Sequence, residues 1–91
     1  WIVTKDEIAE PQDLHIDVEQ NGTNVMKAHT ADMINGLRDL IRFLSSVTTL
    51  MPGTLITTGT PAGVSKLADG DHLKGTISGI GTMELNVVAE Q

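Results

Sequence analysis

Apolar and polar residues alternate along the segment from residue 14 to residue 20. Leu14, Ile16 and Val18 fall on one side of an extended chain, and polar residues fall on the other. This two-residue period is typical of a strand with one buried face. Asn21-Gly22 follows, and this dipeptide readily adopts the positive φ angles of a two-residue hairpin turn. The pattern predicts a β-hairpin over residues 14–29, with the three apolar side chains facing inward.

The hydrophobic period changes after residue 30. Thr30 stands where a helix N-cap is expected, and Asp32 would place a carboxylate in the first turn, where it suits the helix dipole. Gly36 costs roughly 1 kcal/mol inside a helix, which indicates close packing at that point. A helix between Thr30 and Val47 is therefore predicted, with one apolar face that is buried. That face comprises Met33, Ile34, Leu37, Leu40, Ile41 and Leu44.

Short segments with β-branched or alternating apolar residues follow, separated by turns. Residues 54–58, 73–78 and 82–89 are predicted strands, and residues 1–3 are a further candidate. The predicted fold class is α+β, with mostly antiparallel strands and one amphipathic helix. Because one helix and a few short strands cannot enclose a complete core, we expect the rest of the fold in a longer polypeptide. The absence of an initiator Met before Trp1 agrees with that expectation.

Composition narrows the class of protein. The 91 residues suffice for one domain, and the net charge of -6 comes from 6 basic and 12 acidic residues. No basic cluster is present to bind a phosphate backbone, so no nucleic-acid partner is expected. The absence of cysteine excludes disulfides and thiolate sites within the chain. No apolar segment approaches the ~20 residues of a membrane span. We expect a cytoplasmic protein with no membrane partner.

The titratable residues are scattered. His15, His29 and His72 lack the spacing of a helical zinc site, and we interpret them as surface residues. Asp6-Glu7 and Asp69-Gly70-Asp71 are interpreted as solvated turns, because hard cations need several converging oxygen ligands. The sequence therefore predicts no catalytic group and no metal ligand within the chain.

One loop could bind a ligand. Gly59 allows the backbone to approach a ligand closely, and Pro61 stiffens the chain that follows. The Thr60 hydroxyl and the amides at the end of the preceding segment could bind a carboxylate or enolate oxygen. Alternatively the loop is only a tight turn, in which Thr60 bonds to its own backbone.

Residues 58–64, Thr-Gly-Thr-Pro-Ala-Gly-Val, resemble the TGTP-x-G loop of the fumarylacetoacetate hydrolase superfamily. The resemblance extends in order and spacing over essentially the whole chain. The matching segments are residues 1–8 with Pro11, Asn21-Gly22, and residues 30–34, 50–53 and 79–81. The chain looks most similar to bacterial isomerase/decarboxylases of homoprotocatechuate breakdown and to acylpyruvate hydrolases. It departs from commoner members at Asn35, which replaces a large apolar residue, and at residues 24–27, which replace a polar stretch with Arg-Gln.

The resemblance implies that residues 1–91 are the C-terminal portion of a single catalytic domain. The family binds Mg²⁺ or Mn²⁺ through a Glu-x-Glu pair and a further acidic residue, and it uses a catalytic Lys. In hydrolases of the family a His–Glu pair activates water. All these groups would precede Trp1, and Lys5 does not match the catalytic Lys. Of the family's functional segments, only the TGTP-x-G loop matches residues of this chain, and the resemblance implies that Gly59 and Thr60 bind substrate.

The implied function is part of a divalent-metal-dependent isomerase/decarboxylase that acts on 2-oxo or 2-hydroxydienoate acids in aromatic-compound catabolism. One alternative is an acylpyruvate-type C–C bond hydrolase or a hydratase. An alternative from another class is a non-catalytic binding or dimerisation module. The intact protein is expected to bind a small keto acid and to form a homodimer, whereas the isolated fragment is expected to be inactive.

Overall fold

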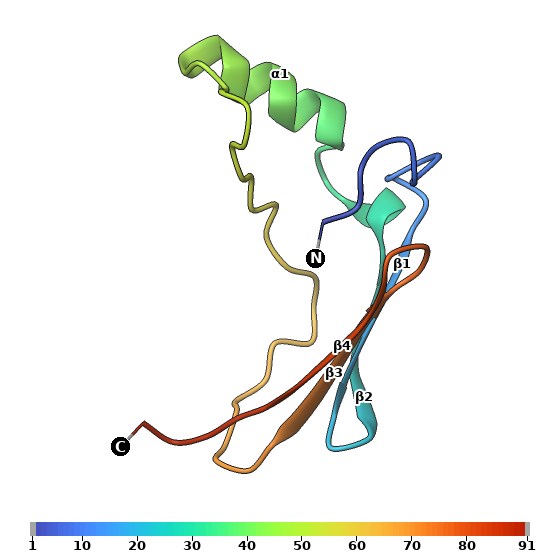
Figure 1. Ribbon diagram of the computed structural model, residues 1–91, viewed down its shortest axis with the longest axis vertical. Helices are drawn as coiled ribbons and strands as arrows, with labels where there is room; N and C mark the ends of the chain where they lie inside the picture. The colour runs from blue at the N-terminus through green and yellow to red at the C-terminus, as the bar shows by residue number, and fades with distance from the viewer. Residues whose placement is uncertain (1, 91) are drawn as a thin grey trace.

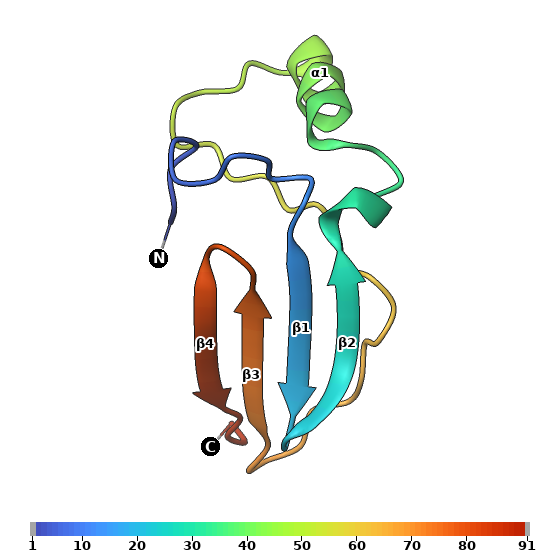
Figure 2. The same cartoon turned by 90° about the vertical axis from the view of Figure 1, so that its right-hand side faces the viewer.

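A four-stranded antiparallel sheet with one α-helix beyond its end forms the structure, a computed structural model that describes residues 2–90 (Figure 1). The strand order is β2-β1-β3-β4 (Figure 2). This arrangement confirms the predicted α+β class. Within residues 2–90, no helix is long and apolar enough to span a membrane. The elements are β1 (His15–Gln20), β2 (Thr23–His29), a 3-10 turn η1 (Thr30–Asp32), α1 (Leu37–Val47), β3 (His72–Ile77) and β4 (Gly81–Asn86).

The predicted hairpin is confirmed as β1 and β2. Asn21 and Gly22 have φ angles of 53° and 78°, the pair of positive values that a type I′ turn requires. The three apolar residues predicted to face inward, Leu14, Ile16 and Val18, are half-buried. Asp17 and Glu19 are half-buried as well, so the local sequence pattern was sufficient to specify the two strands and the turn but not a difference in burial between the two faces.

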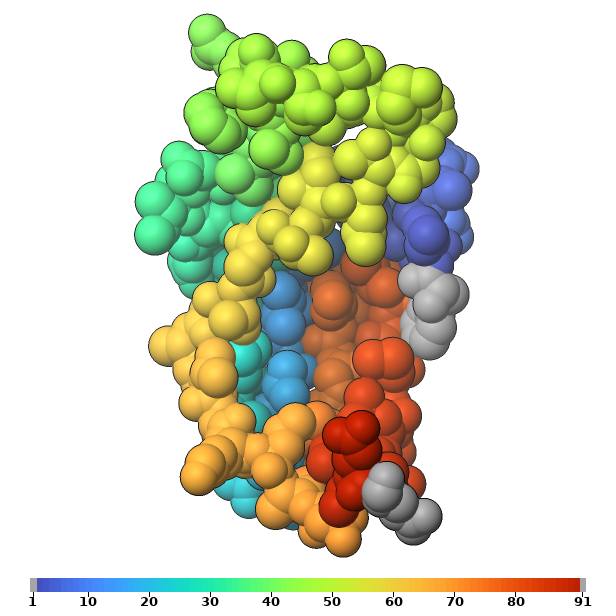
Figure 3. All heavy atoms as spheres, turned by 90° about the vertical axis from the view of Figure 1, so that its left-hand side faces the viewer, coloured from blue at the N-terminus to red at the C-terminus, as the bar shows by residue number. Residues whose placement is uncertain are grey.

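The sheet has one apolar face, which we define by Ile16, Val18, Met26, Ile77 and Met83. Val18 pairs with Met26 on β2 and with Gly75 on β3, which pairs with Met83 on β4. These paired residues form one row across the sheet, and Ile16 and Ile77 form a second row two residues along the strands. Since side chains alternate along a strand, residues two apart point to the same side, so the two rows share a face. The chain between α1 and β3 passes in front of the sheet, with the strands visible behind it (Figure 3).

The helix begins later than predicted. Thr30 is not the N-cap of α1. Thr30 is instead the first residue of η1, and its hydroxyl accepts a hydrogen bond from Leu14 N at 2.9 Å. The N-cap of α1 is Gly36, which has no side chain, and the Leu37 amide instead donates to Gln12 Oε1 at 2.6 Å. Gln12 also donates through Nε2 to the Thr30 carbonyl at 2.7 Å. A residue 25 positions away therefore sets the start of α1, which local capping patterns cannot show.

The prediction that the helix buries its apolar face is wrong for this chain. Ile34 is 100% exposed and Ile41 is 51% exposed, while the leucines of the face are only half-buried. The physical reason is that α1 lies beyond the end of the sheet, so no layer covers it (Figure 1). Among the residues that the structure describes, no hydrophobic side chain is fully buried.

Residues 54–58 do not form the predicted strand. Their β-branched composition favours an extended backbone, but a strand also needs a neighbour to complete its hydrogen-bond ladder. Within the described range, this segment runs as an irregular extended chain in which Leu55 is 86% exposed. Of the candidate strand at residues 1–3, Trp1 lies outside the described residues, and Ile2 and Val3 are not in a strand. The other two predicted strands are present as β3 and β4.

The turn at residues 69–71 is present, but the interpretation of Asp71 as solvated is wrong. Asp71 is only 9% exposed. Its carboxylate accepts hydrogen bonds from Ala68 N at 2.8 Å, Gln20 Nε2 at 2.7 Å and Asn21 Nδ2 at 2.8 Å. The backbone bond from Ala68 lowers the pKa of the Asp71 carboxyl most, followed by the two side-chain bonds. Asp71 therefore ties the hairpin turn to the chain before β3.

We expect Asp71 to make stability fall in acid. The pKa of its carboxyl in the fold lies below 3.8, so its stabilising contribution is complete above that value and is lost as pH falls through the lower pKa. Denaturant titrations at neutral pH and at about pH 3 should show this loss. Asp71→Asn should lower stability at neutral pH and reduce the difference between the two conditions, whereas Asp32→Asn, at an exposed position, should do neither. An undiminished pH dependence in Asp71→Asn would contradict the assignment.

Candidate functional site

The loop predicted to bind a ligand lies against β2. Gly59 and Gly63 have φ angles of 86° and 113°, in the left-handed region that favours glycine. Thr60 is exposed. A Cβ added at Gly63 would overlap the Val25 carbonyl oxygen and would stand 3.1 Å from Met26 Cα. The loop therefore approaches β2 more closely than any residue with a side chain would allow.

The Thr60 hydroxyl is directed to β2. Its Oγ1 lies 4.0 Å from the Met26 sulfur, a contact that spans 34 residues of sequence. A thioether is a weak hydrogen-bond acceptor, so the hydroxyl can donate to a stronger acceptor that approaches it. An exposed hydroxyl beside glycine backbone can contact the carboxylate or carbonyl oxygen of a small molecule.

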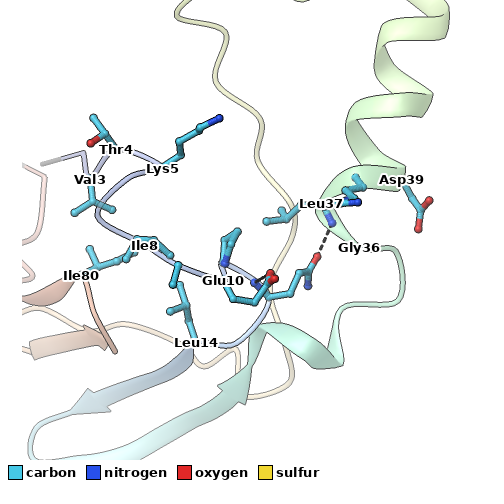
Figure 4. A pocket seen from close by; sticks show the side chains of 14 residues that line it. Val3, Thr4, Lys5, Ile8, Glu10, Leu14, Gly36, Leu37, Asp39 and Ile80 are labelled. Carbon is cyan, nitrogen blue, oxygen red and sulfur yellow. Dashed lines mark hydrogen bonds between the residues drawn. The ribbon is translucent and has the colours of Figure 1, made fainter.

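Two hollows border the sheet. The larger, of about 970 Å³, lies between the N-terminal segment and the start of α1. Figure 4 shows Lys5 and Asp39 among its charged lining residues and Ile8 and Ile80 among its apolar ones. The smaller, of about 230 Å³, lies on the apolar sheet face over Val18 and neighbouring residues. Sequence reasoning did not predict the larger hollow, because it depends on how Gln12 holds α1.

Of the three histidines interpreted as surface residues, His15 is exposed, as expected, whereas His29 and His72 are half-buried. The His15 ring meets that of His29 edge-on at 4.5 Å, across the β1–β2 pair. His29 Nε2 pairs with Asp13 at 3.1 Å, while its Nδ1 accepts from Ala31 N at 3.1 Å. With both ring nitrogens engaged, His29 serves to fix the end of the hairpin. The strand register could have indicated the contact between the two rings, since their residues pair directly.

His72, the first residue of β3, contacts two polar side chains of β4. Its Nδ1 is 3.0 Å from Asn86 Oδ1, and its Nε2 is 3.4 Å from Glu84 Oε2. Across the part of the chain that the structure describes, no three His, Cys, Asp or Glu side chains converge as a metal site would require.

Asp6-Glu7 is a solvated turn, as interpreted. Glu7 Oε2 accepts from Thr4 N at 2.7 Å, and the Thr4 hydroxyl lies 2.5 Å from Asp6 Oδ1. The Thr4 side chain is the main cause of the lowered pKa of Asp6, and the Thr4 backbone amide is the main cause of the lowered pKa of Glu7. Both carboxylates therefore stabilise the local turn.

Comparisons with known proteins show the family of the chain. The family model of the fumarylacetoacetate (FAA) hydrolase C-terminal domain matches residues 1–88. Over 87 residues the chain is 41% identical to a maleylpyruvate hydrolase from Aquipseudomonas alcaligenes, covering 96% of this chain and 30% of that protein. It is 37% identical over 91 residues to a 4-hydroxyphenylacetate degradation bifunctional isomerase/decarboxylase from Salmonella dublin, covering 100% of this chain and 21% of that protein.

A solved structure shows the same fold. It is the maleylpyruvate hydrolase from Sphingobium sp. SYK-6 in complex with manganese(II) and pyruvate, with a TM-score of 0.96 and 37% identity. The match covers 100% of this chain and 34% of that one. The fold and the glycine-bordered loop thus define a segment of an α+β domain. The chain belongs to the fumarylacetoacetate hydrolase family, which confirms the resemblance. It spans between about a fifth and a third of the length of the relatives described above.

Proposed function

We propose that residues 1–91 are the C-terminal portion of a single catalytic domain in a divalent-metal-dependent enzyme that acts on 2-oxo or 2-hydroxydienoate acids. The relatives named as a hydrolase and as an isomerase/decarboxylase support this proposal, as does the manganese and pyruvate complex of a structural neighbour. We further propose that the intact protein is a cytoplasmic homodimer.

The observation that carries the proposal is the placement of Thr60. Thr60 is exposed, its hydroxyl is in weak contact with the Met26 sulfur, and it follows a glycine with a positive φ angle. We assign Thr60 the task of donating a hydrogen bond to a carboxylate or carbonyl oxygen of the substrate. Gly59 allows the backbone to approach the same oxygen, because no side chain stands between them.

The described residues of this chain do not form a binding site for the divalent metal ion. Residues 2–90 contain no converging group of three His, Cys, Asp or Glu side chains. We therefore assign the metal ligands and the catalytic Lys to sequence before Trp1, and we give this chain the role of holding one end of the substrate.

Two reactions remain candidates within the enzyme class. We place isomerase/decarboxylase activity first, and the similarity to maleylpyruvate hydrolases favours C–C bond hydrolysis as the alternative. A non-catalytic binding or dimerisation module is the candidate from outside that class.

The test is turnover by the full-length polypeptide that contains this chain, with Mg²⁺ or Mn²⁺ and after chelation. Two probes separate the candidates. Release of pyruvate from maleylpyruvate indicates the hydrolase, and isomerisation of 2-hydroxyhepta-2,4-diene-1,7-dioate indicates the isomerase. We expect activity on one probe that is lost on chelation, and none from residues 1–91 alone. Failure with both probes would favour the non-catalytic module.

A further inference from the structure

The chain contains two Asn-Gly dipeptides, Asn21-Gly22 and Asn35-Gly36. Asparagine is a thermolabile residue, because its side-chain amide can react with the backbone nitrogen of the residue that follows. Glycine favours this reaction, since it has no side chain to keep its nitrogen away from the amide carbon. The first dipeptide lies in the turn between β1 and β2, whereas Asn35 precedes the N-cap of α1.

Both polar atoms of the Asn21 side chain are bonded to the chain at the start of β3. Nδ2 donates to Asp71 Oδ1 at 2.8 Å, and Oδ1 accepts from His72 N at 2.9 Å. The Asn21 backbone amide also donates to the His72 carbonyl oxygen at 2.8 Å. The side-chain amide is thus held at its nitrogen and at its oxygen, and these bonds oppose its rotation toward the Gly22 nitrogen.

We propose that Asn21 is a latent deamidation site, which the hydrogen bonds to Asp71 and His72 keep closed in the folded protein. In the reaction the Gly22 nitrogen gives up its proton to hydroxide and attacks Asn21 Cγ. A new N–Cγ bond forms, the Cγ–Nδ2 bond breaks, and Nδ2 takes a proton from water and leaves as ammonia. Water then opens the cyclic imide at either carbonyl and yields aspartate or isoaspartate.

Conversion would replace an attraction by a repulsion at this junction. An aspartate at position 21 has no side-chain donor for Asp71 and would bring a second carboxylate to the first. Gln20 Nε2 donates to the other carboxylate oxygen of Asp71 at 2.7 Å, and Gln20 Oε1 accepts from Ser65 Oγ at 2.7 Å. The same junction therefore attaches the chain after the Gly59–Gly63 loop to the hairpin, and deamidation would weaken that attachment.

The first test measures conversion at Asn21 in the full-length polypeptide at mildly alkaline pH, by digestion and mass spectrometry. Breaking a hydrogen bond to a charged group changes an equilibrium by about ten- to a hundredfold. Asp71→Ala should therefore speed conversion at Asn21 by that factor. In concentrated urea, where no fold protects either dipeptide, Asn21 and Asn35 should convert at similar rates, and Asn21 should convert faster than in the folded wild type.

Gln20→Ala is the matched control, because it removes the other side-chain amide from the Asp71 carboxylate and leaves both bonds of the Asn21 side chain in place. It should lower stability but keep conversion at Asn21 within about threefold of wild type. If Asp71→Ala does not fold, Asp71→Asn, which keeps the size of the side chain, takes its place. Equal acceleration in Gln20→Ala and the Asp71 variant, or a folded wild-type rate equal to that in urea, would overturn the proposal.

The second test places the reaction product in the full-length polypeptide directly. Asn21→Asp should raise the equilibrium constant of unfolding by about ten- to a hundredfold, because a donor is lost and two carboxylates meet. Combining Asn21→Asp with Asp71→Asn should recover much of this loss, since the new amide can donate to the new carboxylate. Additive losses in the double variant would show that the two side chains do not interact, which would also overturn the proposal.

Discussion

Replacing Thr60 by Val in the full-length polypeptide should lower kcat/KM by about ten- to a hundredfold. The substitution keeps the shape of the side chain and removes the hydroxyl that we assign to a substrate oxygen. Losing a hydrogen bond to a charged group costs roughly 1.5–3 kcal/mol, which corresponds to this range. Because Thr60 is exposed and its hydroxyl, within residues 2–90, makes a weak contact with the Met26 sulfur, the melting temperature should change little.

Two further variants separate a substrate contact from a general effect on the loop. Thr60→Ser retains a hydroxyl and should recover most of the activity. Thr57→Val makes the same chemical change just before the loop, also at an exposed position, and should leave kcat/KM unchanged. Unchanged efficiency in Thr60→Val, accompanied by lower stability, would show that Thr60 is only a turn residue.

Replacing Gly63 by Ala should have an effect at least as large, because it displaces the whole loop. The new Cβ would overlap the Val25 carbonyl oxygen, and the φ of 113° is unfavourable for alanine. We expect the loop to relieve the overlap by moving away from β2, which would displace Thr60. A displacement of about 1 Å can cost roughly a hundredfold in rate, so kcat/KM should fall by that order.

Gly53→Ala provides the matched control. Gly53 has a φ of 85°, but a Cβ added there would meet nothing within 4 Å. It therefore imposes the backbone strain of a left-handed alanine without the overlap. If Gly53→Ala and Gly63→Ala reduced kcat/KM equally, strain alone would explain the loss, and close packing of the loop on β2 would not be needed.

The sequence predicted those parts of the fold that depend on neighbouring residues. The alternation from Leu14 to Val18 and the Asn21-Gly22 dipeptide predicted the hairpin, because strand period and turn conformation are local properties. It was less successful where distant residues decide the structure. Gln12 sets the start of α1, and Asp71 is buried by its bonds to the hairpin turn.

The same distinction holds for the candidate site. Gly59 and Thr60 were proposed as substrate-binding residues from the loop sequence, but their neighbour across the fold was not predicted. Thr60 contacts Met26 beside a bulge of β2, where Val25 is left out of the pairing with β1, and no period in residues 23–29 indicates that extra residue. The exposure of α1 was also missed, because an amphipathic pattern shows which face can be buried and not whether another layer covers it.

The most direct test of the account is a crystal structure of the full-length polypeptide with Mn²⁺ and pyruvate. We predict that Thr60 Oγ1 lies at hydrogen-bonding distance, roughly 2.5–3.0 Å, from a carboxylate or carbonyl oxygen of pyruvate. The metal should be held by side chains from outside residues 1–91. A pyruvate bound at the metal with the Gly59–Gly63 loop beyond hydrogen-bonding distance would contradict the assignment of this chain to substrate binding.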